Sequence, residues 1–149
     1  MMTECLDASV IVKWFKEDEP DRDKSKILYQ RIENFEADFI TNEWTLLEVT
    51  RALSKSKYKK EEIEEANSIL KDLRTLGAIK ILSVSSVIDL SQKLEVDLDL
   101  YASDAVHIAT AIHTTSNIFW SEDQHHHKTK VKQELQKHNI EIKRLKEVG

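Results

Sequence analysis

The sequence predicts an α/β fold, a three-layer α/β/α sandwich around a central, mostly parallel sheet of four to five short strands. Short apolar runs of strand length alternate with longer stretches in which apolar residues recur at helical spacing. This alternation is typical of a parallel sheet that helices cover on both faces. Only two glycines and one proline occur among 149 residues, which argues against an all-β fold with many tight turns. The length fits a single domain, residues 1–149.

The first strand is predicted over residues 3–8, where the carboxylate of Asp7 interrupts an apolar run. Residues 9–16 follow as a short helix, because their apolar side chains recur at helical spacing. Asp7 should therefore lie at the carboxyl end of a strand, the edge of an open α/β sheet where ligands bind. Aspartate is also a good N-cap, so capping of this helix is the alternative role.

The next helix is predicted over residues 21–35, since Pro20 and the acidic residues around it mark a helix start. Residues 37–41 are short enough for a second strand. Asn42 is expected to cap the helix that follows, in which Glu48 lies among apolar residues.

The helix predicted over residues 60–76 has the clearest pattern, with one apolar stripe and Gly77 at the position of a C-cap glycine. A third strand, residues 79–84, precedes a helix that a serine caps and that runs to about Leu94. The helix over residues 103–115 is apolar nearly all round, which places it in the interior.

The C-terminal part combines a fourth strand over residues 117–121, a lysine-rich helix over 124–138 and a last strand over 140–145.

The net charge of the chain is −5, but it is unevenly distributed. Residues 1–123 hold 15 basic and 24 acidic residues, a net of −9, whereas residues 124–149 hold 7 and 3, a net of +4. A phosphate-bearing partner is compatible with this pattern, and solvated helix faces are the alternative explanation.

The only cysteine, Cys5, lies in the first apolar run and is expected to be a buried thiol. A single cysteine forms no disulfide within the chain, which fits a reducing cytosol. The sequence shows neither a signal peptide nor an apolar run of transmembrane length. We therefore expect a cytoplasmic protein without a membrane partner.

Four acidic residues interrupt apolar segments: Asp7, Glu48, Asp104 and Asp123. Asp7 and Asp123 follow predicted strands, whose carboxyl ends meet at one edge of a parallel sheet. Carboxylates that converge there without lysine or arginine repel one another unless a divalent cation neutralises them. Mg²⁺ and Mn²⁺ prefer oxygen ligands, and such an ion can activate water for attack on a phosphodiester. Considered singly, each acid has an ordinary structural explanation, such as a position in the first turn of a helix.

The segments around these acids resemble the four acidic motifs of the PIN-domain ribonucleases. They occur in that family's order and at its spacing, and they are residues 6–15, 43–53, 103–111 and 119–123. The resemblance covers nearly the whole chain. Among PIN proteins, the chain is most similar to the small VapC toxins of toxin–antitoxin pairs.

The resemblance implies a PIN fold and Mg²⁺- or Mn²⁺-dependent endonucleolytic cleavage of RNA. It implies that the four acids are the metal ligands and that Ser9 or Ser121 holds them in place by hydrogen bonds. VapC-like toxins are commonly homodimers, inhibited by a small antitoxin whose tail lies across the active site. A homodimer and a small antitoxin partner are therefore expected as well.

The fourth motif departs from the family's pattern of Thr or Ser, a variable residue, Asp and often an aromatic residue. Here Ser121, Glu122 and Asp123 are followed by Gln124 and the histidines 125–127. Whether Asp123, Glu122 or neither of them reaches the metal is therefore open. Three adjacent imidazoles on a helix point about 100° apart and cannot share one zinc ion, so a phosphate contact or a solvated helix start is expected for them.

The leading functional hypothesis is a metal-dependent endoribonuclease, the toxin component of a toxin–antitoxin pair. One alternative is a housekeeping PIN nuclease in RNA processing, and another is a non-catalytic PIN-like module that binds RNA or protein. Retention of all four acids argues against the binding module. A haloacid-dehalogenase-type phosphatase is excluded because Ser9 stands where a second Asp is required.

His107, one turn after Asp104, either faces the site or packs in the core.

Overall fold

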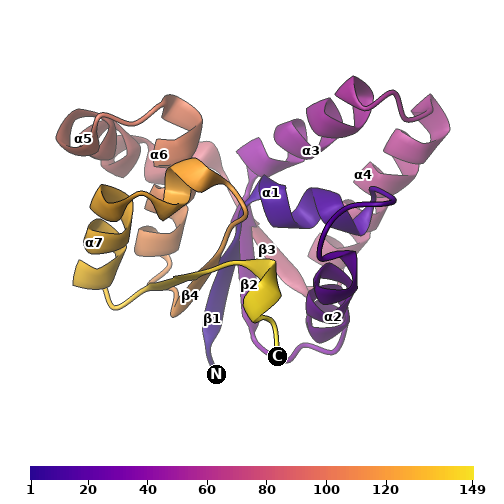
Figure 1. Ribbon diagram of the computed structural model, residues 1–149, viewed down its shortest axis with the longest axis horizontal. Coiled ribbons are helices and arrows are strands. Elements are labelled where there is room, and N and C mark those ends of the chain that lie inside the picture. The colour runs from indigo at the N-terminus through magenta and orange to yellow at the C-terminus, as the bar shows by residue number, and fades with distance from the viewer.

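Five strands form one sheet in the order β3-β2-β1-β4-β5, and every neighbouring pair is parallel. The computed structural model describes residues 1–149 (Figure 1). The strands are β1 (Thr3–Leu6), β2 (Asp38–Asn42), β3 (Ile79–Leu82), β4 (Ile118–Trp120) and β5 (Glu141–Lys143). The predicted α/β fold is therefore confirmed, with five strands and no antiparallel pair.

Seven α-helices cover the two faces of the sheet (Figure 1). They are α1 (Ala8–Ile11), α2 (Arg22–Glu33), α3 (Glu43–Lys55), α4 (Lys60–Thr75), α5 (Ile88–Leu98), α6 (Ala102–His113) and α7 (Thr129–Lys137). Four short 3₁₀ turns also occur: η1 (Val12–Trp14), η2 (Val84–Val87), η3 (Gln124–His127) and η4 (Leu145–Glu147). Helices α1–α4 lie on one side of the sheet and α5–α7 on the other.

Two hydrophobic cores fill the spaces between the sheet and these helix layers. Successive strand residues point to opposite faces, so Leu6 packs in the core under α1–α4 while Cys5 packs in the core under α5–α7. Phe119 and Trp120 of β4 are divided between the two cores in the same way. The three-layer sandwich follows from this alternation.

Helix ends agree with the sequence signals in two places. Asn42 accepts a hydrogen bond from the Thr45 N–H at the start of α3. Gly77 follows α4 with φ of +76°, the left-handed conformation that a C-cap glycine adopts without strain. None of the helices combines the length and apolar composition needed to cross a bilayer.

Other element boundaries differ from the prediction. Strand β1 ends at Leu6, so Asp7 follows the strand and caps α1. The lysine-rich helix predicted over residues 124–138 is divided, because Lys128 adopts an extended conformation between η3 and α7. A 3₁₀ turn therefore carries the three histidines, and this changes the direction in which their side chains point.

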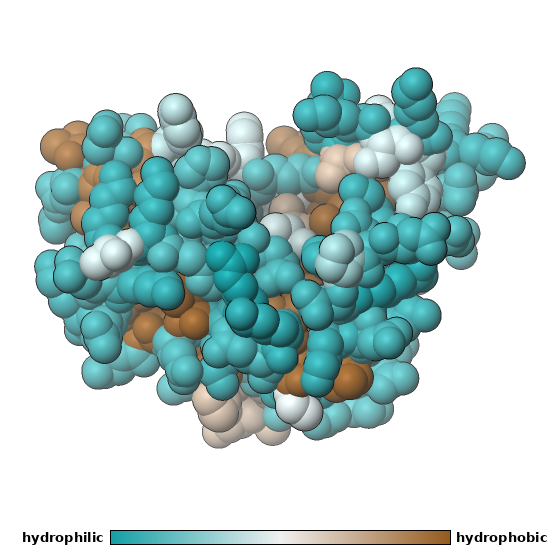
Figure 2. Space-filling view, in the orientation of Figure 1, coloured by the Kyte–Doolittle hydropathy of each residue, from teal (hydrophilic) through white to brown (hydrophobic).

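The surface in the orientation of Figure 1 is mostly hydrophilic (Figure 2), as expected for a chain with 33% charged residues. An apolar area lies at the upper left, over α5 (Figure 2). Two apolar residues of this helix, Ile88 and Val96, are exposed.

Candidate functional site

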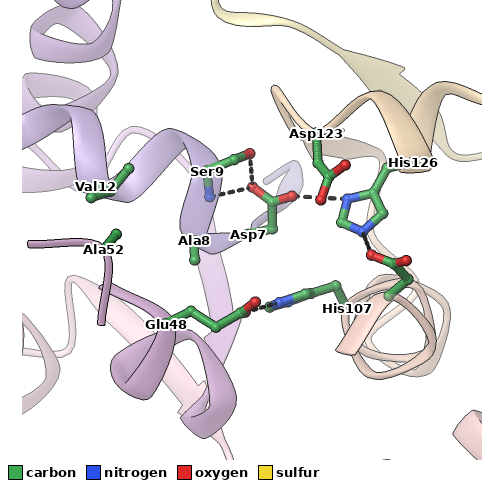
Figure 3. Close-up of a pocket in the computed structure, with 10 residues that line it drawn as sticks. Asp7, Ala8, Ser9, Val12, Glu48, Ala52, His107, Asp123 and His126 are labelled. Atoms are coloured by element: carbon green, nitrogen blue, oxygen red, sulfur yellow. Dashed lines mark hydrogen bonds and ion pairs between the residues drawn. The ribbon is translucent and has the colours of Figure 1, made fainter. Parts of the chain in front are cut away.

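A cavity of about 210 Å³ lies at the carboxyl ends of β1 and β4, between α1, α3, α6 and η3. All four predicted acids line it, and no lysine or arginine does (Figure 3). The lining residues are Asp7, Ala8, Ser9, Val12, Glu48, Ala52, Asp104, His107, Asp123 and His126. The structure thus brings together acids that lie up to 116 positions apart, between 7 and 123.

Asp7 is buried at the end of β1 and is held from several sides. Its Oδ1 accepts hydrogen bonds from the backbone N–H (3.0 Å) and the hydroxyl of Ser9. Its Oδ2 accepts one from the hydroxyl of Ser121 at 2.5 Å. Asp7 therefore caps α1 and also presents a fixed carboxylate to the cavity, so the two roles considered for it coexist.

His126 lies between two of the acids. Its Nδ1 is 2.9 Å from Asp7 Oδ2, and its Nε2 is 2.9 Å from Asp104 Oδ1 (Figure 3). The ring is buried, so the expectation of a phosphate contact or a solvated helix start is wrong for this histidine. The reason is the 3₁₀ turn, closed by a bond from the His126 N–H to the Asp123 carbonyl, which turns the middle histidine inward while His125 stays exposed.

The charges of this group depend on one another. Burial lowers the pKa of His126, but hydrogen bonds to Asp104 and Asp7 and the charge of Asp7 outweigh it and raise the pKa to about 10. Burial raises the pKa of Asp7, yet the hydrogen bond and charge of His126 prevail and lower it to about 2. For Asp104, the same contact with His126 overcomes burial and lowers the pKa. One imidazolium therefore neutralises part of an otherwise uncompensated acidic cluster.

Glu48 reaches the cavity from α3. Its side chain is 35% exposed, and Oε1 is hydrogen-bonded to Nε2 of His107, a residue of α6 (Figure 3). The His107 side chain is only 4% exposed. His107 therefore both lines the site and packs in the interior, so the two alternatives considered for it apply together.

The two candidates for the fourth acid point in different directions. Asp123 lines the cavity and caps η3, accepting a hydrogen bond from the His125 N–H at 2.9 Å. Glu122 points away, with Oε1 3.6 Å from Lys13 Nζ and Oε2 accepting from the Leu145 N–H. The geometry thus favours Asp123 as the acid that faces the site.

The donor set fits a hard divalent cation. Carboxylate oxygens of Asp104 and Asp123 lie within 4.8 Å of each other, beside the imidazolium of His126, and carboxylates are the ligands that Mg²⁺ and Mn²⁺ prefer. Asp7 and Glu48 contribute further oxygens to the same cavity. The site is partly open and acidic, as a cation site at a sheet edge requires.

Two solved structures similar to this chain are the VapC20 toxin of Mycobacterium tuberculosis, described as cleaving the sarcin–ricin loop, and a chain of the VapBC2 complex of Rickettsia felis bound to promoter DNA. The first is 14% identical with a TM-score of 0.63, covering 80% of this chain and 89% of the toxin. The second is 15% identical with a TM-score of 0.63, covering 96% and 98%.

At these identities, the two structures show a shared fold. No curated protein sequence matches the chain. The model of the PIN domain family matches residues 5–132, which include every acid of the cavity. This chain therefore belongs to the PIN domain family.

Proposed function

We propose that this protein is a divalent-metal-dependent endoribonuclease and the toxin component of a toxin–antitoxin pair. The observation that carries the proposal is the convergence of four carboxylates, from four separate segments, on one open cavity without lysine or arginine. His126 compensates only part of this negative charge, and a non-catalytic binding module has no physical need for the remainder. Membership of the PIN domain family supports the nuclease assignment.

In this proposal, Asp7, Glu48, Asp104 and Asp123 hold Mg²⁺ or Mn²⁺. A bound ion of this kind lowers the pKa of a water molecule and stabilises the leaving oxygen of a phosphodiester. Ser9 and Ser121 position the ligand set through Asp7.

The only cysteine of the chain, Cys5, does not line the cavity. Cys5 is buried, and burial together with the charge of Asp7 raises the pKa of its thiol, which keeps it protonated. The Ser9 hydroxyl, which lines the cavity, is hydrogen-bonded to Asp7. We therefore assign the attack on the phosphodiester to a water molecule that the metal ion would activate. The single reduced cysteine also supports a location in the cytoplasm.

RNA is the proposed substrate, and a small antitoxin is the proposed protein partner, with a homodimer as the proposed assembly. One similar structure is described as a toxin that cleaves the sarcin–ricin loop, and the other comes from a VapBC2 complex on promoter DNA. The positive net charge of residues 124–149, which include η3, supports an approach of the RNA backbone to this side of the site.

Cleavage of a mixed cellular RNA pool by the purified protein tests the proposal, with Mg²⁺, with Mn²⁺ and with EDTA. We expect defined fragments that require the metal and that disappear for Asp7→Asn, because this variant removes a ligand charge while keeping the side-chain shape. Asp72→Asn is the matched control, since Asp72 is exposed on α4. Full metal-dependent cleavage by Asp7→Asn would contradict the site assignment, and equal cleavage in EDTA would contradict metal dependence.

A further inference from the structure

Asn42 is a buried residue at the end of β2 whose amide orientation is fixed by helix capping. Its Oδ1 accepts a hydrogen bond from the Thr45 N–H at 3.1 Å. A reversed amide would set two donors against each other at this position. The oxygen must therefore face α3, and the NH₂ group must face the opposite direction.

The NH₂ group of Asn42 points toward α6. It donates to Thr110 Oγ1 at 3.0 Å and lies 3.2 Å from His107 Nδ1. The Thr110 hydroxyl already donates its own hydrogen to the Val106 carbonyl at 2.7 Å, so its oxygen acts as the acceptor for Asn42. Both contacts thus agree on the direction of the Asn42 amide.

This direction determines where the proton of the His107 ring lies. Nδ1 faces a donor and must offer its lone pair, because a proton on Nδ1 would oppose the NH₂ group of Asn42. The ring proton is therefore on Nε2, which faces Glu48 Oε1. The hydrogen bonds run in one direction from Asn42 through His107 to Glu48.

Glu48 needs such a constraint because it is a long side chain on an exposed part of α3. At 35% exposure, packing alone leaves it several rotamers. The Nε2–H donor selects the rotamer that points into the cavity (Figure 3). It engages only Oε1, so Oε2 remains available to a ligand.

We infer that His107 is a positioning residue that aims Glu48 into the site, with Asn42 setting the imidazole tautomer. Hydrogen bonds from outer residues orient carboxylate ligands in metal sites in general. The role of Glu48 as a metal ligand rests on the proposed function, whereas the direction of the hydrogen bonds rests on Asn42, Thr45 and Thr110.

The tautomer is measured directly by nitrogen-15 NMR of the imidazole groups in the metal-free protein. We expect His107 to show a protonated Nε2 and an unprotonated Nδ1. His107→Gln identifies the signals by their loss, and the exposed His113 of the same helix serves as the internal reference. A proton on Nδ1 of His107 would overturn the inference, whether or not the protein cleaves RNA.

Metal binding is measured by titration of the protein with Mn²⁺ alone. His107→Leu removes the donor at similar size, and we expect the Mn²⁺ affinity to fall by about 10- to 100-fold. His107→Gln keeps an N–H group near the position of Nε2, so affinity should recover to within a few-fold of the wild type. His113→Gln is the matched control and should bind like the wild type. Circular dichroism establishes that each variant is folded.

The outcomes separate this inference from the proposed function. Wild-type Mn²⁺ affinity and RNA cleavage in folded His107→Leu would overturn the positioning role while leaving the nuclease assignment intact. If the wild type neither binds Mn²⁺ nor cleaves RNA, the proposed function fails. The direction of the hydrogen bonds from Asn42 through His107 is then tested by the tautomer measurement alone. Loss of affinity in both His107→Leu and His107→Gln, with the Nδ1–H tautomer, would also overturn the inference.

Discussion

Two buried carboxylates, Asp7 and Asp104, share the imidazole of His126 between them. Two like charges in one enclosed site repel, and the cost is reduced when a cation lies between them. In this protein, a side chain supplies that cation. At the scale of single residues, His126 therefore links the stability of the protein to the ionisation of its candidate site.

The stability of the metal-free protein should depend on pH through His126. The pKa of this residue is raised from 6.5 to about 10 on folding, so its contribution is complete below pH 6.5 and is lost as pH rises toward 10. We expect the free energy of unfolding to fall over this range by a few kcal/mol, since one pKa unit corresponds to about 1.4 kcal/mol. Urea denaturation in EDTA at several pH values measures this change.

His126→Gln is the comparison for this measurement. Glutamine does not ionise, so the slope of stability against pH should become shallower between pH 6.5 and 10. An unchanged slope in a folded His126→Gln protein would show that other groups cause the pH dependence. The exposed His113→Gln should keep the wild-type slope.

An ion pair between the buried Glu4 and the half-buried Arg31 joins α2 to the centre of the sheet. Glu4 of β1 is 1% exposed and accepts hydrogen bonds from both terminal nitrogens of Arg31, at 3.0 and 2.5 Å. It also accepts one from Trp120 Nε1 at 2.7 Å, and the Arg31 guanidinium lies 5.3 Å from the centre of the Phe39 ring. At the scale of elements, this group holds one helix and three strands in a fixed arrangement.

Arg31→Met should leave Glu4 buried without its cation. We expect a loss of up to about 3 kcal/mol in the free energy of unfolding, since the buried Glu4 is left with an uncompensated charge whereas Arg31 is partly exposed. Urea denaturation measures it, with the exposed Arg74→Met as the matched control. Adding Glu4→Gln to Arg31→Met should recover part of the loss. A double variant less stable than Arg31→Met would contradict this explanation.

The candidate site joins the two halves of the sandwich. Asp7 and Glu48 come from the part of the chain that forms β1 and α3, whereas Asp104 and Asp123 come from α6 and the segment after β4. Unfolding disperses these groups, so a cation that binds them together binds the folded state almost exclusively. At the scale of the whole molecule, metal binding and folding should be coupled.

Mn²⁺ should therefore raise the unfolding temperature of the wild type above its value in EDTA. At a concentration about 100 times the dissociation constant, the added stability is about 2.7 kcal/mol. Asp104→Asn should reduce this increment, whereas Asp72→Asn should keep it. Thermal unfolding followed by circular dichroism provides the measurement. The same increment in Asp104→Asn as in the wild type would show that Mn²⁺ binds elsewhere.

Local signals in the sequence were sufficient for most of the fold. Strand-length apolar runs and helical periodicity predicted four to five strands and their order along the chain. Asn42 and Gly77 marked helix ends where the structure has them. These features depend on neighbours within a few residues, so periodicity and capping chemistry reveal them. The division of the 124–138 helix was missed because no proline or glycine marks the break at Lys128.

The sequence by itself determined which acids interrupt apolar segments. The alternation of strands and helices also determined that Asp7 and Asp123 follow strands and lie at the same edge of the parallel sheet. Only the tertiary structure decided that His126 lies between Asp7 and Asp104 and that Glu48 pairs with His107 across 59 positions. It also turned Asp123 toward the cavity and Glu122 toward Lys13. The physical reason is that side-chain direction in a short turn, and hydrogen bonds between distant segments, depend on the packing of the whole sandwich.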